Sequence, residues 1–279
     1  MPNRRNFLKT TGTGLAAATI PNLSNASDSP VRKGKSKSEI KLGVASYTLR
    51  EFSLEDAIEM TLRCGVNRIT FKSMHLPLDS DNKTIKKVVA LCKEKGLVLY
   101  GAGNIDMRTR EEVDQAFEYA KAAEMDMIIG VPSHELLEYV EGKVKAYDIK
   151  LAINNHGPGD KLYPSAVSAY EKIKHMDKRM GLCLDTGHTQ RLNRDPGQDT
   201  RDCFDRVFNI HVKDVTASNS EGKSQIVGRG VIDFVSFLKT IVDLNYKGTL
   251  VLEYEDESED PLPAMMESLG YIKGVLAAI

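Results

Sequence analysis

The chain has 279 residues, of which 41% are hydrophobic and 28% are charged, and its formal net charge is −1. This is the balance of an ordinary globular protein, and it gives no electrostatic reason to bind nucleic acid or an anionic membrane surface. The length allows one large α/β barrel or two smaller domains.

The first 38 residues differ in composition from the rest of the chain. Arg4 and Arg5 precede a weakly apolar stretch over residues 10–20, and small residues follow over residues 24–26. This order resembles a twin-arginine export signal followed by a polar linker. The apolar stretch is too short to span a bilayer permanently, so we predict an exported, periplasmic protein with no stable membrane span. The alternative is a basic tail with no targeting role.

The cysteines do not form a CxxC pair, and a disulfide framework is not expected in a chain of this length. We predict free, buried thiols, which fits a protein that is exported after folding in a reducing cytoplasm. The four positions are Cys64, Cys92, Cys183 and Cys203.

From residue 40 onward, short apolar strands alternate with helical segments. The helical spacing is clear at Ile85, Val88, Val89 and Cys92, which fall at i, i+3, i+4 and i+7. Ser53 is a good N-cap for the first helix. The predicted strands cover residues 40–46, 67–73, 97–103, 125–132, 149–156, 180–188, 206–214 and 248–255.

Eight strand–helix units indicate a parallel sheet, and eight is the number that closes a (β/α)8 barrel. We predict an α/β protein with a single TIM barrel over residues 39–279. A doubly wound open sheet is the alternative, but no glycine-rich phosphate-binding segment follows the first strand. Residues 215–230 are predicted to form a long polar loop after the seventh strand.

Polar residues of one parity gather late in the predicted strands. In a barrel, strand side chains alternate between the outer helices and the interior, and catalytic groups gather at the carboxyl ends of the strands. Large apolar residues mark the outward parity in five strands. The inward polar residues are Lys72, Asn154, His156, Asp185, His211, Lys213, Glu253 and Glu255.

Asp185, His211 and Glu253 come from three successive strands. Their tips can surround one ion, because neighbouring strands lie about 4.8 Å apart. Two carboxylates and an imidazole suit a divalent ion, with Mn²⁺ as the first choice and Mg²⁺, Co²⁺ or Zn²⁺ as the others. The alternative is a set of buried ion pairs, Asp185 with Lys213 or Glu253 with Lys72.

The segments GLCLDTGHT, FNIHVKD, GRGVIDF and GTLVLEYE, in this order, resemble the xylose isomerase-like barrel superfamily. That superfamily includes sugar epimerases, inosose dehydratases and the endonuclease IV type of DNA repair enzyme. The resemblance covers residues 40–279 and implies a TIM barrel that removes a proton next to a sugar carbonyl through a metal-stabilised enediolate. FKSMHLPL and NHGP are similar to an exported subgroup, some of whose members cleave 3-keto-glycosides by elimination.

The resemblance also implies roles for particular residues. Sugar epimerases of this group hold the metal with a glutamate, an aspartate, a histidine and a glutamate on strands five to eight, and Asp185, His211 and Glu253 match the last three. Asn154 stands where the first glutamate is usual, so we expect at most a weak neutral ligand there. His156 has the same parity and is the stronger candidate, as a metal ligand or an acid/base group. A histidine that matches His188 usually touches the substrate.

An epimerase that acts without a cofactor needs an acid/base group on each face of the reacting carbon. Glu253 is the first candidate, and Asn154 cannot act as a base. The second group must be another side chain. His156, His188 and Lys72 are the candidates for it, and Lys213 would hold an anionic oxygen or Asp185.

The sequence therefore predicts a metal-dependent sugar isomerase or epimerase that acts on a carbohydrate or keto-glycoside. A 3-keto-glycoside lyase or hydratase on the same site is the alternative, because an elimination needs only one base. A non-catalytic sugar-binding barrel, which the missing strand-five glutamate would allow, is less favoured. A DNA repair endonuclease is also less favoured, since the early strands offer mainly Lys72 and His75. No nucleic-acid partner is expected, and a homo-oligomer is compatible with the sequence.

Overall fold

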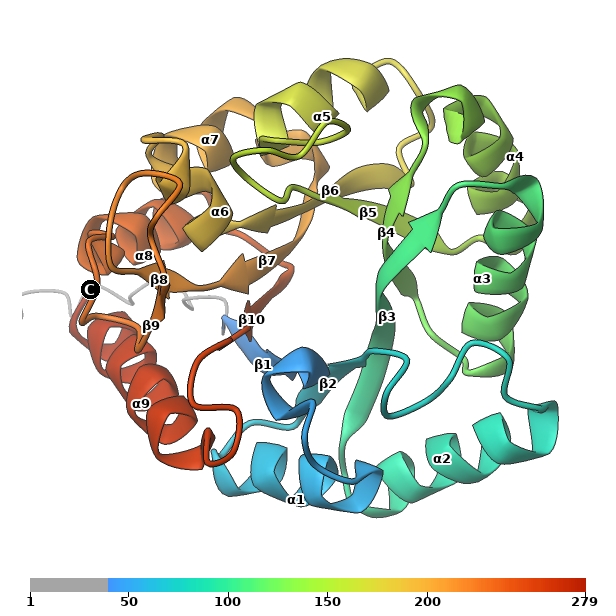
Figure 1. Ribbon diagram of the computed structural model, residues 1–279, viewed down its shortest axis with the longest axis horizontal. Helices are drawn as coiled ribbons and strands as arrows, with labels where there is room; N and C mark the ends of the chain where they lie inside the picture. Colours follow the sequence, from blue (N-terminus) through green and yellow to red (C-terminus); the bar gives the residue numbers. More distant parts are fainter. Residues whose placement is uncertain (1–39) are drawn as a thin grey trace, which may run out of the picture. The chain divides into compact units, whose positions relative to one another are not determined.

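Eight parallel strands close into a barrel, which confirms the predicted (β/α)8 fold and excludes an open sheet (Figure 1). The computed structural model describes residues 40–279, so the predicted export signal and linker lie outside the described residues. Around the barrel the strands follow the order β1-β10-β7-β6-β5-β4-β3-β2. They are β1 (Lys41–Ala45), β2 (Arg68–Phe71), β3 (Val98–Met107), β4 (Met127–Pro132), β5 (Lys150–Asn154), β6 (Met180–Asp185), β7 (Val207–Val212) and β10 (Thr249–Leu252).

Helices surround the barrel on its outside (Figure 1). Most of them begin at a side-chain cap, such as the predicted N-cap Ser53, whose hydroxyl accepts a hydrogen bond from the Asp56 backbone N–H. The α-helices are α1 (Leu54–Arg63), α2 (Asn82–Glu94), α3 (Arg110–Ala122), α4 (Leu137–Tyr147), α5 (Ala166–Ile173), α6 (Thr186–Arg191), α7 (Pro196–Asp202), α8 (Phe234–Asp243) and α9 (Leu262–Ala278). Short 3-10 helices cover Ser46–Leu49, His134–Leu136 and Phe204–Arg206.

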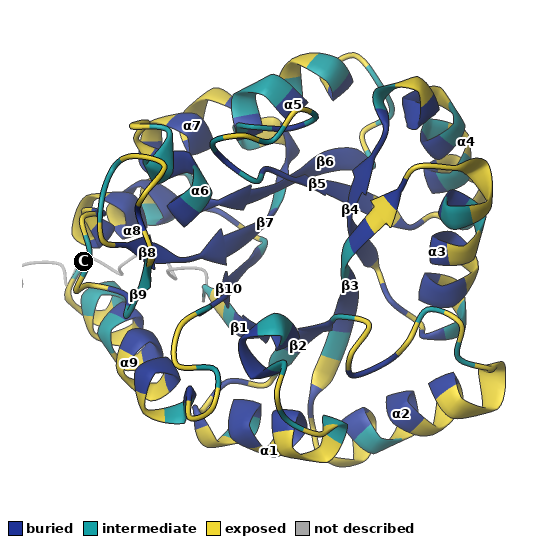
Figure 2. Cartoon of the chain, viewed as in Figure 1, coloured by how far each residue is buried: buried dark blue, intermediate teal, exposed yellow. Residues whose placement is uncertain are grey.

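The alternation along the strands separates two apolar regions, as the predicted parity requires. Outward residues such as Ile153, Leu184 and Val212 belong to the large core between the barrel and the helices. In Figure 2 the barrel strands are mostly buried, and the helices expose their outer faces. A second, small cluster fills the barrel interior with Ala45, Tyr100, Met127, Ile129, Ala152, Cys183 and Val251.

Several predicted boundaries were wrong in detail, among them the ends of two strands and one loop. β3 continues to Met107, past the predicted end at residue 103, with a register shift between Ala102 and Ile105. β6 stops at Asp185, because the Asp185 carboxylate caps α6 and turns the chain into a helix at once. The loop over residues 215–230 contains part of a short antiparallel pair, β8 (Asp214–Val215) with β9 (Ser224–Gln225).

Within residues 40–279 no helix combines the length and the apolar character that crossing a membrane requires. The four cysteines lie in the same part of the chain, and each is buried and free of a disulfide. The prediction of free, buried thiols is therefore confirmed.

Arg206 is fully buried at the amino-terminal end of the β7 strand. Its guanidinium donates hydrogen bonds to four backbone carbonyls, two of them at the ends of α5 and β6. The acceptors are the carbonyl oxygens of Lys174, Met176, Asp177 and Met180, at 2.7–2.9 Å. Arg206 thus ties the α5–β6 connection to the base of β7.

We expect Arg206→Met to lower the free energy of unfolding by about 3–5 kcal/mol, because it leaves buried carbonyl oxygens without a charged donor. Urea denaturation of the purified protein measures the change. Arg229→Met is the matched control, since Arg229 pairs with Glu267 at the surface with 60% and 43% of the two side chains exposed. Arg229→Met should lower the free energy of unfolding by less than about 1 kcal/mol. Equal losses in both variants would contradict the structural role of Arg206.

Candidate metal and active site

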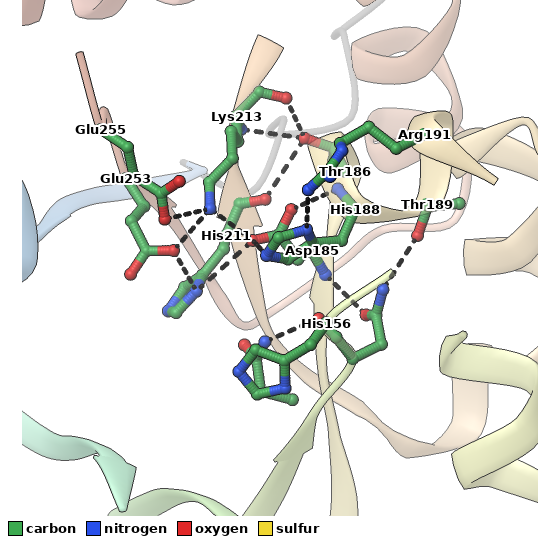
Figure 3. A network of polar contacts seen from close by, with 12 residues as sticks. His156, Asp185, Thr186, His188, Thr189, Arg191, His211, Lys213, Glu253 and Glu255 are labelled. Atoms are coloured by element: carbon green, nitrogen blue, oxygen red, sulfur yellow. Dashed lines mark hydrogen bonds and ion pairs between the residues drawn. The ribbon is translucent and has the colours of Figure 1, made fainter. Parts of the chain in front are cut away.

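Three ligating side chains meet where β6, β7 and β10 end. Asp185 is the last residue of β6 and lies beside His211 of β7 in the strand register, while Glu253 directly follows β10. Their exposed fractions are 0%, 1% and 7%. One ligand atom from each of them lies within 4.8 Å of the other two. We call these three residues the Asp–His–Glu cluster; Figure 3 shows their side chains directed toward one another.

The cluster has the free atoms that a metal site needs. Asp185 Oδ2 and both ring nitrogens of His211 are buried and make no hydrogen bond, and Asp185 Oδ2 has Lys213 Nζ as an ion-pair partner at 3.2 Å. His211 Nδ1 lies 3.2 Å from Glu253 Oε2 and 4.0 Å from Asp185 Oδ2. Buried polar atoms without partners are rare and point to a missing ion or ligand. Two carboxylates and an imidazole fit a divalent cation, and residues 40–279 hold no second group of this kind.

Lys213 brings a positive charge into the same space. Its Nζ lies 3.2 Å from Asp185 Oδ2, 3.1 Å from Glu253 Oε2 and 2.7 Å from Glu255 Oε1, and 2% of its side chain is exposed. The predicted ion pair of Asp185 with Lys213 is therefore present alongside the cluster. The predicted pair of Glu253 with Lys72 is wrong, because Glu253 meets Lys213 and the Lys72 Nζ lies over the Tyr47 ring, 4.1 Å from its centroid.

The charges in the cluster hold one another ionised. Burial raises the pKa of Glu253, but the neighbouring His211 and Lys213 more than offset it, and the pKa lies well below its ordinary value. Burial lowers the pKa of Lys213, yet Asp185, Glu253 and Glu255 raise it well above its usual range. The Glu253 carboxylate and the Lys213 ammonium are thus both charged near neutral pH.

His188 is positioned by the first turn of α6. The His188 backbone N–H donates to Asp185 Oδ1, and His188 Nε2 lies 3.9 Å from Asp185 Oδ2. Burial lowers the pKa of His188 to about 4, so the ring is neutral at physiological pH. Its Nδ1 faces the Arg191 Nη1, a donor, at 3.4 Å, which places the ring proton on Nε2. His188 therefore presents an N–H to the centre of the site.

The end of β5 separates its three polar residues as the parity predicts. Asn155 is structural, because its Oδ1 accepts from the Asp185 backbone N–H at 2.9 Å and fixes the end of β6. Asn154 is buried, with its amide donating to the Asn155 carbonyl and its Oδ1 left without a partner. His156 does not belong to the Asp–His–Glu cluster.

The His156 ring lies apart from Lys213 and Glu253 in Figure 3. It packs against His188 with ring centroids 5.8 Å apart, and its Nε2 is 3.3 Å from Asn104 Nδ2. It also lines a cavity of about 460 Å³, which we call the side cavity. Lys72 lines the same cavity, so the structure places these two acid/base candidates together, beside the cluster.

Three further polar side chains have structural partners. His75 is buried, with its Nε2 3.1 Å from the Leu49 carbonyl oxygen. Arg194 binds the Asp199 carboxylate, and Arg229 pairs with Glu267 on the surface.

Asp214 is a residue that the sequence reasoning did not single out. Its buried carboxylate accepts hydrogen bonds from the backbone N–H groups of Val215, Gly228, Gly230 and Ile232, at 2.8–3.3 Å. A Cβ on Gly230 would lie 2.2 Å from Asp214 Oδ1, so only glycine allows this approach. The GRGVID segment could have pointed to it, since closely spaced glycines often mark a backbone that wraps an acceptor. Asp214 directly follows Lys213 and thus anchors the end of β7.

We expect Asp214→Ala to lower the free energy of unfolding by about 2–3 kcal/mol, because several backbone donors lose a charged acceptor. Loss of those bonds should also release the segment over residues 216–232, so limited proteolysis should cut it much faster than in the parent protein. Glu221→Ala is the control, since Glu221 is exposed in the same loop. Unchanged proteolysis of Asp214→Ala would show that its carboxylate does not hold the loop.

A family model described as a xylose isomerase-like TIM barrel matches residues 55–275. The chain belongs to the xylose isomerase-like TIM barrel family. The family agrees with the resemblance seen in the sequence and with the barrel observed.

Relatives of the chain include named sugar enzymes. The putative L-ribulose-5-phosphate 3-epimerase SgbU of Haemophilus influenzae is 27% identical over 217 residues, which is 73% of each chain. The Escherichia coli protein of that name is 26% identical over 41% of this chain, and the match spans 42% of its own length. An inosose dehydratase of Lactiplantibacillus plantarum is 30% identical over 34% of this chain and 38% of its own. These relatives are enzymes of the sugar isomerase/epimerase superfamily.

Solved structures share the fold. The 3-keto-D-glucoside 4-epimerase YcjR of E. coli superimposes with a TM-score of 0.70 at 16% identity, covering 85% of this chain and 100% of that one. The IOLI protein, solved with a bound zinc atom, gives a TM-score of 0.72 at 15% identity, covering 86% and 99%. At such identities the likeness concerns the fold alone.

Proposed function

We propose that the protein is a divalent-metal-dependent enzyme that removes a proton next to the carbonyl group of a sugar or keto-sugar. One observation carries the proposal: Asp185, His211 and Glu253 converge at the carboxyl ends of three barrel strands, and Asp185 Oδ2 and both ring nitrogens of His211 are buried without a hydrogen bond. Catalytic groups of TIM barrels lie at this end of the strands. The epimerase and dehydratase names of the relatives support a carbohydrate substrate.

Asp185, His211 and Glu253 are the residues that would hold the metal. When bound, the ion supplies a Lewis acid that polarises a carbonyl and stabilises the negative charge that develops on its oxygen. The mixed oxygen and nitrogen donors favour Mn²⁺, with Co²⁺, Mg²⁺ and Zn²⁺ as alternatives. The zinc atom in the IOLI protein supports the choice of a divalent ion.

The chain's own side chains can carry the proton transfer. The Glu253 carboxylate is ionised and accepts the proton from the carbon next to the carbonyl, leaving an enediolate. The Lys213 ammonium lies 3.1 Å from Glu253 and stabilises negative charge on the substrate oxygens. His188 is neutral and donates its Nε2–H to a substrate hydroxyl or carbonyl oxygen. His156 and Lys72 line the adjoining cavity and are the candidates for the second acid/base group.

A lyase or dehydratase on the same site is the second candidate function. The observation that favours it is Asn154 at the tip of β5, because an amide cannot serve as the base on the opposite face of the carbon. Elimination needs one base, which Glu253 supplies, and an acid for the leaving group, which His156 or Lys72 can supply. The inosose dehydratase relative supports this reading.

One incubation separates the two reactions. The purified protein is loaded with Mn²⁺ and given a 3-keto-glucoside in deuterium oxide. Deuterium incorporation with the glycosidic bond intact identifies an isomerase or epimerase, and release of the aglycone identifies a lyase. If metal binds and neither product forms with any keto-sugar tested, the chain is a non-catalytic sugar-binding barrel and the proposal fails. Cleavage of an abasic DNA duplex would instead support the endonuclease alternative.

We also propose that the protein acts outside the cytoplasm, on the basis of Arg4, Arg5 and the apolar stretch that follows. Expression of the full chain followed by cell fractionation tests this. The parent protein should accumulate in the periplasm, and replacement of both arginines by lysine should retain it in the cytoplasm. Cytoplasmic accumulation of the parent protein would contradict the proposal.

A further inference from the structure

The side cavity is a separate compartment at the mouth of the barrel. It lies among the ends of β2, β3 and β4 and the α3 helix, and its volume of about 460 Å³ is in the range of ligand pockets. The residues of the Asp–His–Glu cluster do not line it. His156 does, and His156 packs against His188, which in turn lies beside Asp185. The cavity and the cluster therefore meet at the two histidine rings.

The wall of the side cavity holds polar atoms without hydrogen bonds. Asn104 Oδ1 makes no hydrogen bond in the described part of the chain, and the nearest charged partner of His156 Nδ1 is Asp160 Oδ2 at 3.9 Å. The opposite atoms of these side chains, Asn104 Nδ2 and His156 Nε2, face each other at 3.3 Å and fix the two groups in place. Such atoms favour a ligand that brings hydroxyl groups.

The charges around the cavity favour a neutral ligand. Among the described residues that line it, Lys72 is the only lysine or arginine, and its ammonium is directed over the Tyr47 ring. Asp106 pairs with Arg108, and the Glu112 carboxylate caps α3 by accepting from backbone N–H groups. A phosphate group would need several converging donors, which arginine supplies best, and no arginine lines this cavity.

The rest of the wall is apolar, formed in part by Phe71, Leu76, Leu78 and Val131. Apolar surface beside hydrogen-bonding groups suits a ring that has a flat apolar face and hydroxyls at its edge. We propose that the side cavity binds a neutral ring substituent on the reacting sugar, so that the substrate is a glycoside and neither a free nor a phosphorylated monosaccharide. The inference rests on the proposed function, which places the reacting sugar at the Asp–His–Glu cluster.

A second cavity, of about 530 Å³, lies between α2 and α3 on the outside of the barrel. Leu78, Gln115 and Tyr119 line both cavities, so the two adjoin at these residues. Gln115 is an exposed residue of α3, which means that a larger side chain there obstructs the junction without disturbing the core. Ser73 is exposed on the β2 side of the same cavity.

Calorimetric titration of the Mn²⁺-loaded full chain tests the proposal. The ligands are glucose, cellobiose, phenyl glucoside and glucose 6-phosphate. Glucose is the sugar ring alone, cellobiose and phenyl glucoside add a second ring, and glucose 6-phosphate adds a phosphate group. Cellobiose and phenyl glucoside should bind at least about tenfold more tightly than glucose, a gain of about 1.4 kcal/mol. Gln115→Trp should abolish that difference and leave glucose binding unchanged. Gln198→Trp, the same exchange at an exposed position of α7, should bind like the parent protein.

Ser73→Trp fills the cavity from its other side and serves if Gln115→Trp does not fold. The proposal is overturned if the added ring does not strengthen binding, if the tryptophan variants weaken glucose equally, or if glucose 6-phosphate binds most tightly. Phenyl glucoside has no free carbonyl group and cannot turn over, so its binding is measured apart from the reaction. If the added ring does not strengthen binding but the protein turns over a keto-sugar, the side-cavity proposal fails and the proposed function stands. If the added ring strengthens binding but no keto-sugar is turned over, the side-cavity proposal stands and the proposed function fails.

Discussion

Glu253→Gln is expected to lower kcat by about 10³-fold and metal affinity by more than about 100-fold. Glu253 offers the cluster a carboxylate oxygen and is also the candidate base, so one exchange removes both a ligand charge and the proton acceptor. Glutamine keeps the volume and a hydrogen-bonding oxygen, so the barrel should stay folded. The loss of kcat and metal affinity should therefore reflect the missing carboxylate. Elemental analysis after dialysis measures the metal, and solvent deuterium exchange into a keto-sugar measures the reaction.

Glu255→Gln is the matched control, because Glu255 has the same parity two residues later and also contacts Lys213. Its side chain is 36% exposed and lies outside the Asp–His–Glu cluster. A half-exposed ion pair contributes about 0–1 kcal/mol, so metal affinity should change by less than about fivefold. If both variants lose metal equally, or if Glu253→Gln retains it, the ligand assignment is wrong.

Lys213→Met is expected to destabilise the metal-free protein by about 3–5 kcal/mol, the usual cost of removing one partner from a buried charge group. Without the ammonium, Asp185, Glu253 and Glu255 lose the one cation that contacts all three carboxylates in the described part of the chain. Mn²⁺ should recover much of the lost stability, because an ion bound by the cluster supplies positive charge at the same place. Urea denaturation with chelator and with excess Mn²⁺ gives both values.

The control for this prediction is Lys178→Met. Lys178 pairs with Asp205 at 3.7 Å, with 79% and 52% of the two side chains exposed. A surface pair of this kind contributes about 0–1 kcal/mol, and Mn²⁺ should not change the result. If Lys213→Met is as stable as the control in the presence of chelator, the three carboxylates do not need Lys213.

Much of the fold follows from local sequence patterns. The eight strands, the barrel and the inward parity of Asp185, His211 and Glu253 were predicted because strand alternation is a property of the chain itself. The ends of β3 and β6 were not. β3 continues through a register shift that depends on its neighbours, and β6 ends where the Asp185 side chain caps α6, which needs the folded turn.

The site was predicted in part for the same reason. Parity predicted that the Asp–His–Glu cluster lies at one end of the barrel, but it could not decide which lysine forms an ion pair with Glu253. Lys72 and Lys213 both have inward parity, and only the closed barrel shows that Lys213 reaches the carboxylates while Lys72 lies over Tyr47. The roles of His156 and Asn154 as metal ligands stay predictions, and His156 lies outside the cluster.

The sequence by itself determined the alternation of strands and helices and the face on which each strand places its polar residues, because these depend on neighbouring residues in the chain. Only the tertiary structure decided which of those polar residues meet. The carboxylates of β6 and β10 share one lysine and one histidine from β7, the Asp214 carboxylate gathers donors from a loop up to 18 residues away, and His156 turns to the side cavity. These contacts depend on strand register, bulges and loop paths, which are set by packing across the whole barrel.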